Sequence, residues 1–62
     1  MAFPPKYQLE YLDGSIWQIK SFSISSEQTA LIMGTQASKR DPKRKYRIVM
    51  VDGNKKSVVH IF

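Results

Sequence analysis

The chain has 62 residues, 42% of them hydrophobic, no cysteine, and a net charge of +5 at pH 7. A chain this short forms one domain at most, and its apolar content is that of a folded domain and not of a disordered tail. The absence of cysteine excludes disulfides, thiolate metal sites and cysteine catalysis, and no apolar run reaches the roughly 18 residues needed to span a bilayer.

Residues 1–5 are expected to form an extended N-terminal segment. Pro4 and Pro5 fix their own backbone angles and carry no N–H to donate to a strand. The segment also lacks the charged region followed by an apolar region that marks a signal peptide. We therefore expect a soluble cytoplasmic protein with a single domain over residues 1–62.

The next segment predicts a β-hairpin, because two strand-like runs flank Asp13-Gly14. A two-residue Asp-Gly loop would place the apolar residues of the two strands on opposite faces. A three-residue loop, with Gly14 left-handed, shifts the pairing by one and gathers them on one face. We predict the latter, with a shared face of Tyr7, Leu9, Tyr11, Trp17 and Ile19. The apolar phase changes at Lys20-Ser21, which predicts a bulge or the end of the strand there.

Residues 26–37 predict a helix. Ser25 and Gln28 have the spacing of a capping box, and Glu27 suits the positive end of a helix dipole. One narrow apolar stripe follows, with Gly34 as an early stop signal; it consists of Ala30, Met33, Gly34 and Ala37, with Leu31 on its flank. Because Ile32 points the other way, a strand over residues 29–35 remains an alternative.

Residues 39–45, "KRDPKRK", predict a basic loop, because an Asp before a Pro disfavours helix. The charge is uneven along the chain. Residues 1–38 carry two lysines against three acidic residues, and residues 39–62 carry eight Lys or Arg against two Asp. Such asymmetry is typical of a protein with a polyanionic partner or a basic face.

A second hairpin follows, with a turn centred on Gly53-Asn54 that pairs Ile48 with Val59 and Arg47 with His60. This register predicts a core face of Tyr46, Ile48, Met50, Val59 and Ile61. The opposite face is also apolar and holds Arg47, Val49, Val51, Val58, His60 and Phe62.

These elements predict an α+β fold of ββαββ order, in which two hairpins form an antiparallel sheet covered by one helix. The alternative is a five-stranded SH3-like β-barrel with residues 29–35 as its middle strand. In the two-layer fold the second apolar face of the last hairpin meets water. Such a face indicates a partner surface or a homodimer interface, formed by Val49, Val51, Val58 and Phe62. β-branched residues also simply suit strands.

The chain offers little for catalysis. It has a single histidine, His60, and its five acidic residues are scattered, with Asp13 and Asp52 in turns. The three glycines are isolated and form no phosphate-binding loop. We therefore expect a non-enzymatic protein without catalytic residues, metal or cofactor.

The basic residues suggest binding of a nucleic acid, DNA or RNA, through phosphate contacts. The candidates are Lys39, Arg40, Lys43, Arg44, Lys45, Arg47, Lys55 and Lys56. The alternative is a protein-interaction module that engages an acidic protein surface and uses the apolar outer face or a free strand edge. A membrane partner is not expected, because the predicted helix carries no Lys or Arg before its end.

Overall fold

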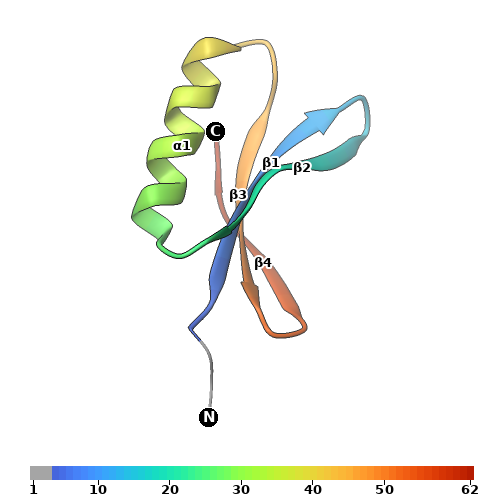
Figure 1. Ribbon diagram of the computed structural model, residues 1–62. Helices are drawn as coiled ribbons and strands as arrows, with labels where there is room; N and C mark the ends of the chain where they lie inside the picture. Colours follow the sequence, from blue (N-terminus) through green and yellow to red (C-terminus); the bar gives the residue numbers. More distant parts are fainter. Residues whose placement is uncertain (1–3) are drawn as a thin grey trace.

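The computed structural model describes residues 4–62, which form two β-hairpins joined by one helix (Figure 1). The elements are β1 (Lys6–Asp13), β2 (Ile16–Ile24), α1 (Glu27–Arg40), β3 (Tyr46–Asp52) and β4 (Lys55–Ile61). Paired strands are antiparallel and form one open sheet of order β2-β1-β3-β4, with α1 on one face.

This arrangement confirms the predicted ββαββ fold. The barrel alternative is wrong, because the described sheet does not close and residues 29–35 are helical. Of the predicted extended segment 1–5, residues 1–3 lie outside the described part, and Pro4 and Pro5 precede β1 without regular structure.

The core lies between α1 and the two central strands of the sheet. Leu9 of β1 pairs with Ile48 of β3, and both side chains are at most 1% exposed. The helix contributes the small buried residues Ala30 and Ala37, which allow it to pack close to the strands.

The first hairpin has a different register from the predicted one. Asp13 pairs with Ile16, so the loop is the two residues Gly14-Ser15, and only the left-handed Gly14 (φ 66°) is as predicted. Trp17 and Ile19 therefore lie on the face opposite α1, which we call the outer face. The prediction that one face gathers all the apolar residues of this hairpin was wrong. The outer face also carries aromatic and apolar residues, which make contacts of their own.

β2 is bulged where the apolar phase changes, which confirms the predicted break. Glu10 pairs with Ile19 while Leu9 pairs with Ser21, which leaves Lys20 as the extra residue. Lys20 lies on the helix side by alternation from Gln18, and the bulge turns Ser21 to the same side.

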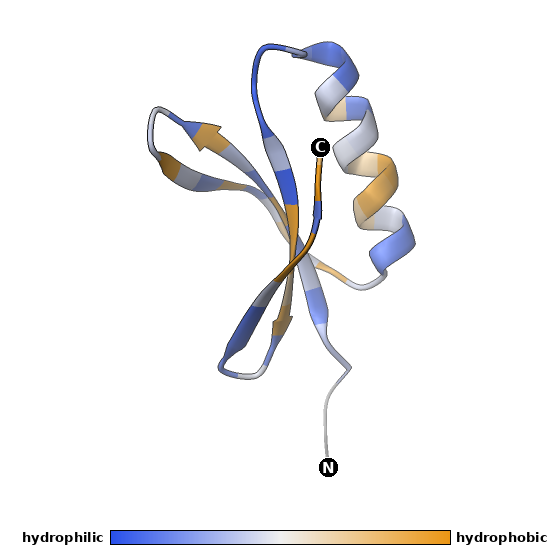
Figure 2. Cartoon of the chain, turned by 180° about the vertical axis from the view of Figure 1, so that it is seen from behind, coloured by the Kyte–Doolittle hydropathy of each residue, from blue (hydrophilic) through white to orange (hydrophobic). Residues whose placement is uncertain are grey.

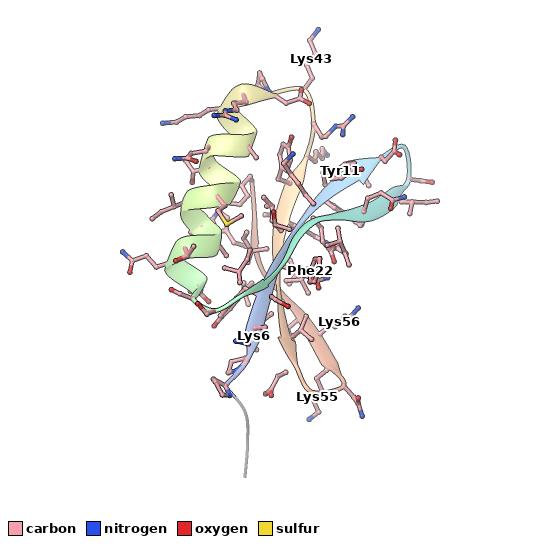
Figure 3. All side chains as sticks on the ribbon, viewed as in Figure 1. Lys6, Tyr11, Phe22, Lys43, Lys55 and Lys56 are labelled. Atoms are coloured by element: carbon pink, nitrogen blue, oxygen red, sulfur yellow. The ribbon has the colours of Figure 1, made fainter. Side chains whose placement is uncertain are left out.

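A second irregularity in β2 lies at Ser23, which has a left-handed backbone (φ 58°). It brings Ile24 into the core, where the side chain is 8% exposed. The neighbouring Phe22 is 72% exposed and lies on the side of the sheet away from α1 (Figure 3).

The helix begins one residue later than the capping box predicted. Its N-cap is Ser26, not Ser25, and the Ser26 hydroxyl accepts from the Thr29 N–H at 3.5 Å. The extended backbone of Ser26 (φ −135°, ψ 135°) is the usual geometry of a capping residue.

The helix also ends later than predicted, at Arg40. Lys39 and Arg40 thus lie in the last turn of the helix and not in a loop. The helix dipole favours cations in that last turn. The helix stops at Asp41, whose N–H still donates to Ala37 O at 3.0 Å, because Pro42 follows. The basic loop of the structure is residues 41–45.

In the second hairpin the predicted turn is correct and the pairing near its base is not. Val49 pairs with Val58 as the turn requires, but a bulge then places His60 opposite Ile48 and Ile61 opposite Arg47. The predicted pairs Ile48–Val59 and Arg47–His60 were therefore wrong, because a single extra residue exchanges the two faces beyond it.

Phe62 consequently lies on the helix side and not on the outer face. Its ring covers Gly34, where any Cβ atom would clash with the ring. Gly34 is thus a close-packing position inside the helix rather than a helix stop.

Candidate nucleic-acid interface

The predicted basic residues do not form one patch. Lys39, Arg40 and the lysines of the basic loop gather at one end of the molecule, which is hydrophilic in Figure 2. Lys55 and Lys56 of β4 lie at the opposite end (Figure 3).

Arg47 belongs to neither end, because it lies on the outer face within an internal network. Its Nε donates to Glu10 Oε1 at 2.7 Å, and its guanidinium lies 4.2 Å from the centre of the Trp17 ring. Glu10 is 6% exposed and also accepts from Gln8 Nε2 at 2.5 Å. Arg47 therefore compensates a buried carboxylate rather than presenting a free charge to a phosphate.

The end that carries the basic loop is hollowed. A cleft of about 360 Å³ lies between the second half of α1 and the strands β1 and β2. Its apolar residues are Leu9, Met33, Ala37 and Tyr46. Its polar and charged residues are Lys20, Ser21, Gln36, Arg40, Asp41 and Arg44.

A second hollow of about 410 Å³ lies between the basic loop and the tip of the first hairpin. It shares Asp41 and Arg44 with the cleft, so the two adjoin. The Leu12 N–H donates to Lys45 O at 2.9 Å and ties the loop to β1. We call the two hollows together the basic groove; its cations are Lys20, Arg40, Lys43, Arg44 and Lys45, and its acids are Asp13 and Asp41.

Arg44 is held where the two hollows meet. Its Nε lies 3.6 Å from Asp41 Oδ2, and its guanidinium lies 4.7 Å from the centre of the Tyr11 ring. Lys43 and Lys45 are exposed and form no ion pair with an acidic residue within residues 4–62. The groove therefore combines one positioned guanidinium with exposed ammonium groups.

Lys20 was not among the basic residues predicted from the sequence to bind nucleic acid. It lies in the half of the chain without positive surplus, and the register predicted for the first hairpin does not place it on the helix side. The two-residue loop Gly14-Ser15 gives the opposite alternation, in which Lys20 follows Gln18 on the helix side, and the bulge then keeps Ser21 on that side as well.

Of the four residues predicted to form an exposed apolar face, two are covered in the structure. Phe62 packs against α1, and Val49 is 3% exposed in the centre of the sheet. Val51 is half-buried and Val58 is 47% exposed. The outer face exposes other large apolar side chains instead, namely Ile19 (51%), Phe22 (72%) and Ile61 (63%).

The edges of the sheet are poor templates for an added strand. β2 has two register shifts along its pairing with β1, and β4 has one along its pairing with β3. Such bulges discourage strand addition. Both edge strands of the described sheet are therefore irregular.

Within the described residues, no three His, Cys, Asp or Glu side chains lie close enough together to hold a metal ion. The His60 ring packs edge-on against Phe62 at 4.5 Å between centroids. None of the helices described is long and apolar enough to cross a membrane. Comparisons with protein-family models, with characterised proteins and with solved structures found no match to this chain.

Proposed function

We propose that this is a non-enzymatic nucleic-acid-binding protein whose basic groove holds the sugar–phosphate backbone. The observation that carries the proposal is the convergence of five cations from β2, α1 and the basic loop on one groove that contains two acids. Each cation that neutralises a phosphate releases condensed counterions, which favours binding. A groove whose lining has a net positive charge also concentrates the potential that attracts a polyanion.

The cations supply two kinds of phosphate contact. Arg40 and Arg44 present planar forks that match two phosphate oxygens, whereas the lysines act as mobile point charges. Neither kind reads base sequence, so the proposed contacts position a strand without selecting its sequence.

The test is fluorescence anisotropy with labelled short oligonucleotides and the double variant Lys43→Glu with Lys45→Glu. Both side chains are exposed, so the exchange spares the core. We expect affinity at 0.1 M salt to fall at least about tenfold, because two phosphate contacts are lost.

The matched control is Lys55→Glu with Lys56→Glu, which changes the net charge equally at the opposite end. It should alter the affinity less than about twofold with strands too short to reach both ends. Equal losses in the two variants would contradict a localised groove, and absence of binding by the unmodified protein would refute the function.

A second candidate function is self-association through the outer face. Glu10 and Arg47 neutralise each other at its centre, and the positive surplus lies at the two ends, so a second copy of the chain meets a neutral, apolar surface. Covering Ile19, Phe22, Val58 and Ile61 on both copies removes on the order of 1,000 Å² from water, which approaches the size of a stable interface. Trp17 stacked with Arg47 is of the residue types that dominate interface energies.

This candidate is tested by light-scattering mass over a range of concentration. Val58→Lys with Ile61→Lys should shift the protein to monomer, because charged groups replace apolar ones in the contact. Ile32→Lys, on the exposed side of α1 (Ile32 is 52% exposed), is the control and should leave the mass unchanged. A monomer at every concentration for the unmodified protein would rule this candidate out.

A further inference from the structure

The cleft differs from the rest of the basic groove in having an apolar floor. Leu9 and Tyr46 are 1% and 4% exposed, and Ala37 is 8% exposed. The cations Lys20, Arg40 and Arg44 come from three separate elements around this floor. A site that is apolar inside and cationic around its rim fits a ligand with a flat apolar part and an attached anion.

We propose that the cleft binds an unpaired base of a single-stranded nucleic acid, while the cations around it hold the flanking phosphates. This rests on the proposed function and adds a substrate class to it. The volume of about 360 Å³ is within the range of small-molecule ligand sites. A phosphate alone would leave the buried floor without a contact, whereas a base covers it.

The charges of the cleft also favour a base over a phosphate at its centre. The C-terminal end of α1 carries the negative end of the helix dipole, and the Asp41 carboxylate lies on the same side. Both repel a phosphate placed deep in the cleft. Both can accept hydrogen bonds from the amino groups of a base, which carries donors and no charge.

A duplex does not satisfy this arrangement. Its phosphates are accessible to the cations, but its bases are paired and stacked, and placing one in the cleft requires flipping it out of the helix. A single strand offers each base at much lower cost. The bulge in β2 matters here, because it places Ser21 beside Lys20 on the wall of the cleft facing α1.

The test is NMR of the protein labelled with ¹³C at methionine methyl groups. Met33 lines the cleft, and Met50 pairs with Tyr7 across β1 and β3 and does not line it, so Met50 is an internal control. The two ligands are a six-nucleotide single strand and a deoxyribose-phosphate chain of the same length without bases, which carries the same charge. Affinity is measured for both ligands by anisotropy competition.

We expect the intact strand to bind at least about fivefold tighter than the base-free chain, as when one base is stacked. Ring currents of the inserted base should shift the Met33 methyl signal, whereas the base-free chain should leave that signal unmoved. The Met50 methyl signal should stay in place with both ligands. Equal affinity of the two ligands with an unmoved Met33 signal would overturn base insertion and leave phosphate binding intact. Failure of both ligands to bind would instead refute the proposed function.

Discussion

Arg47 is the residue on which the outer face depends. Its guanidinium is the charged partner of Glu10, whose side chain is 8% exposed, and it also stacks on Trp17. Removing one member of a buried ion pair leaves the other charge desolvated and uncompensated. We therefore expect Arg47→Ala to lower the free energy of unfolding by about 2–3 kcal/mol, measured by urea denaturation.

The control for this prediction also removes the Glu10 charge that Arg47→Ala leaves uncompensated. Glu10→Gln in the Arg47→Ala background should recover part of the loss, because a neutral amide can share hydrogen bonds with Gln8. If Arg47→Ala alone costs less than about 0.5 kcal/mol, the pair is an ordinary surface contact.

Ser23 provides a test of backbone strain at an exposed position. Its φ of 58° lies in the left-handed region, which β-branched residues strongly disfavour and glycine adopts freely. The side chain is exposed, so few contacts complicate the comparison. We expect Ser23→Val to be less stable than Ser23→Gly by about 1–2 kcal/mol in urea denaturation. Equal stability of the two variants would argue against a left-handed backbone in β2.

At the scale of elements, the contact between α1 and Phe62 joins the second hairpin to the helix. The three atoms nearest to an ideal Cβ on Gly34 all belong to the Phe62 ring. Gly34→Ala therefore improves helix propensity by about 1 kcal/mol but expels a ring whose burial contributes about 2 kcal/mol. The variant should be destabilised by about 1 kcal/mol overall.

The sign should reverse when the ring is absent. In the background Phe62→Ala, the exchange Gly34→Ala should raise the free energy of unfolding by about 0.5–1 kcal/mol, since only the propensity gain remains. Measuring all four proteins gives the coupling energy directly. Additive effects would show that Phe62 and Gly34 do not pack together in solution.

The element order was predictable because each element has strong local signals. Asp-Gly and Gly-Asn mark the turns, Glu27 and the small residues mark the helix, and Asp41-Pro42 marks its end. The registers were less accessible: the break in β2 was predictable from its change of apolar phase, but the loop of the first hairpin and the bulge in the second hairpin were not. The sheet also has two partly apolar faces, so the rule that apolar residues share one face chose the wrong loop at Gly14.

The candidate site was predictable only in part for the same reason. The basic loop is evident from composition, but the participation of Lys20, a residue of β2, depends on the register of the first hairpin. Conversely, Arg47 lies close to the basic cluster in sequence and points to Glu10, a partner 37 residues away. Strand pairing, which composition does not reveal, decides both cases.

At the scale of the whole molecule, the surplus of positive charge is divided between two ends. Five cations line the basic groove, and Lys55 and Lys56 lie at the far end. The affinity of a short single strand held in the groove should therefore fall as the salt concentration rises. The slope of that fall should depend on the cations of the groove alone. For five phosphate contacts, log K against log salt should have a slope of about −3.5.

Substitutions of lysine by neutral glutamine should show which end of the molecule determines that slope. Lys43→Gln with Lys45→Gln removes two contacts and should reduce the slope to about −2, whereas Lys55→Gln with Lys56→Gln should leave it unchanged. Both variants have the same net charge, so an attraction that depends on total charge predicts equal slopes for them. Anisotropy titrations between 0.05 and 0.3 M salt, roughly the range over which such slopes are linear, separate these outcomes. A slope that changes in both variants would mean that the strand contacts the two ends of the molecule at once.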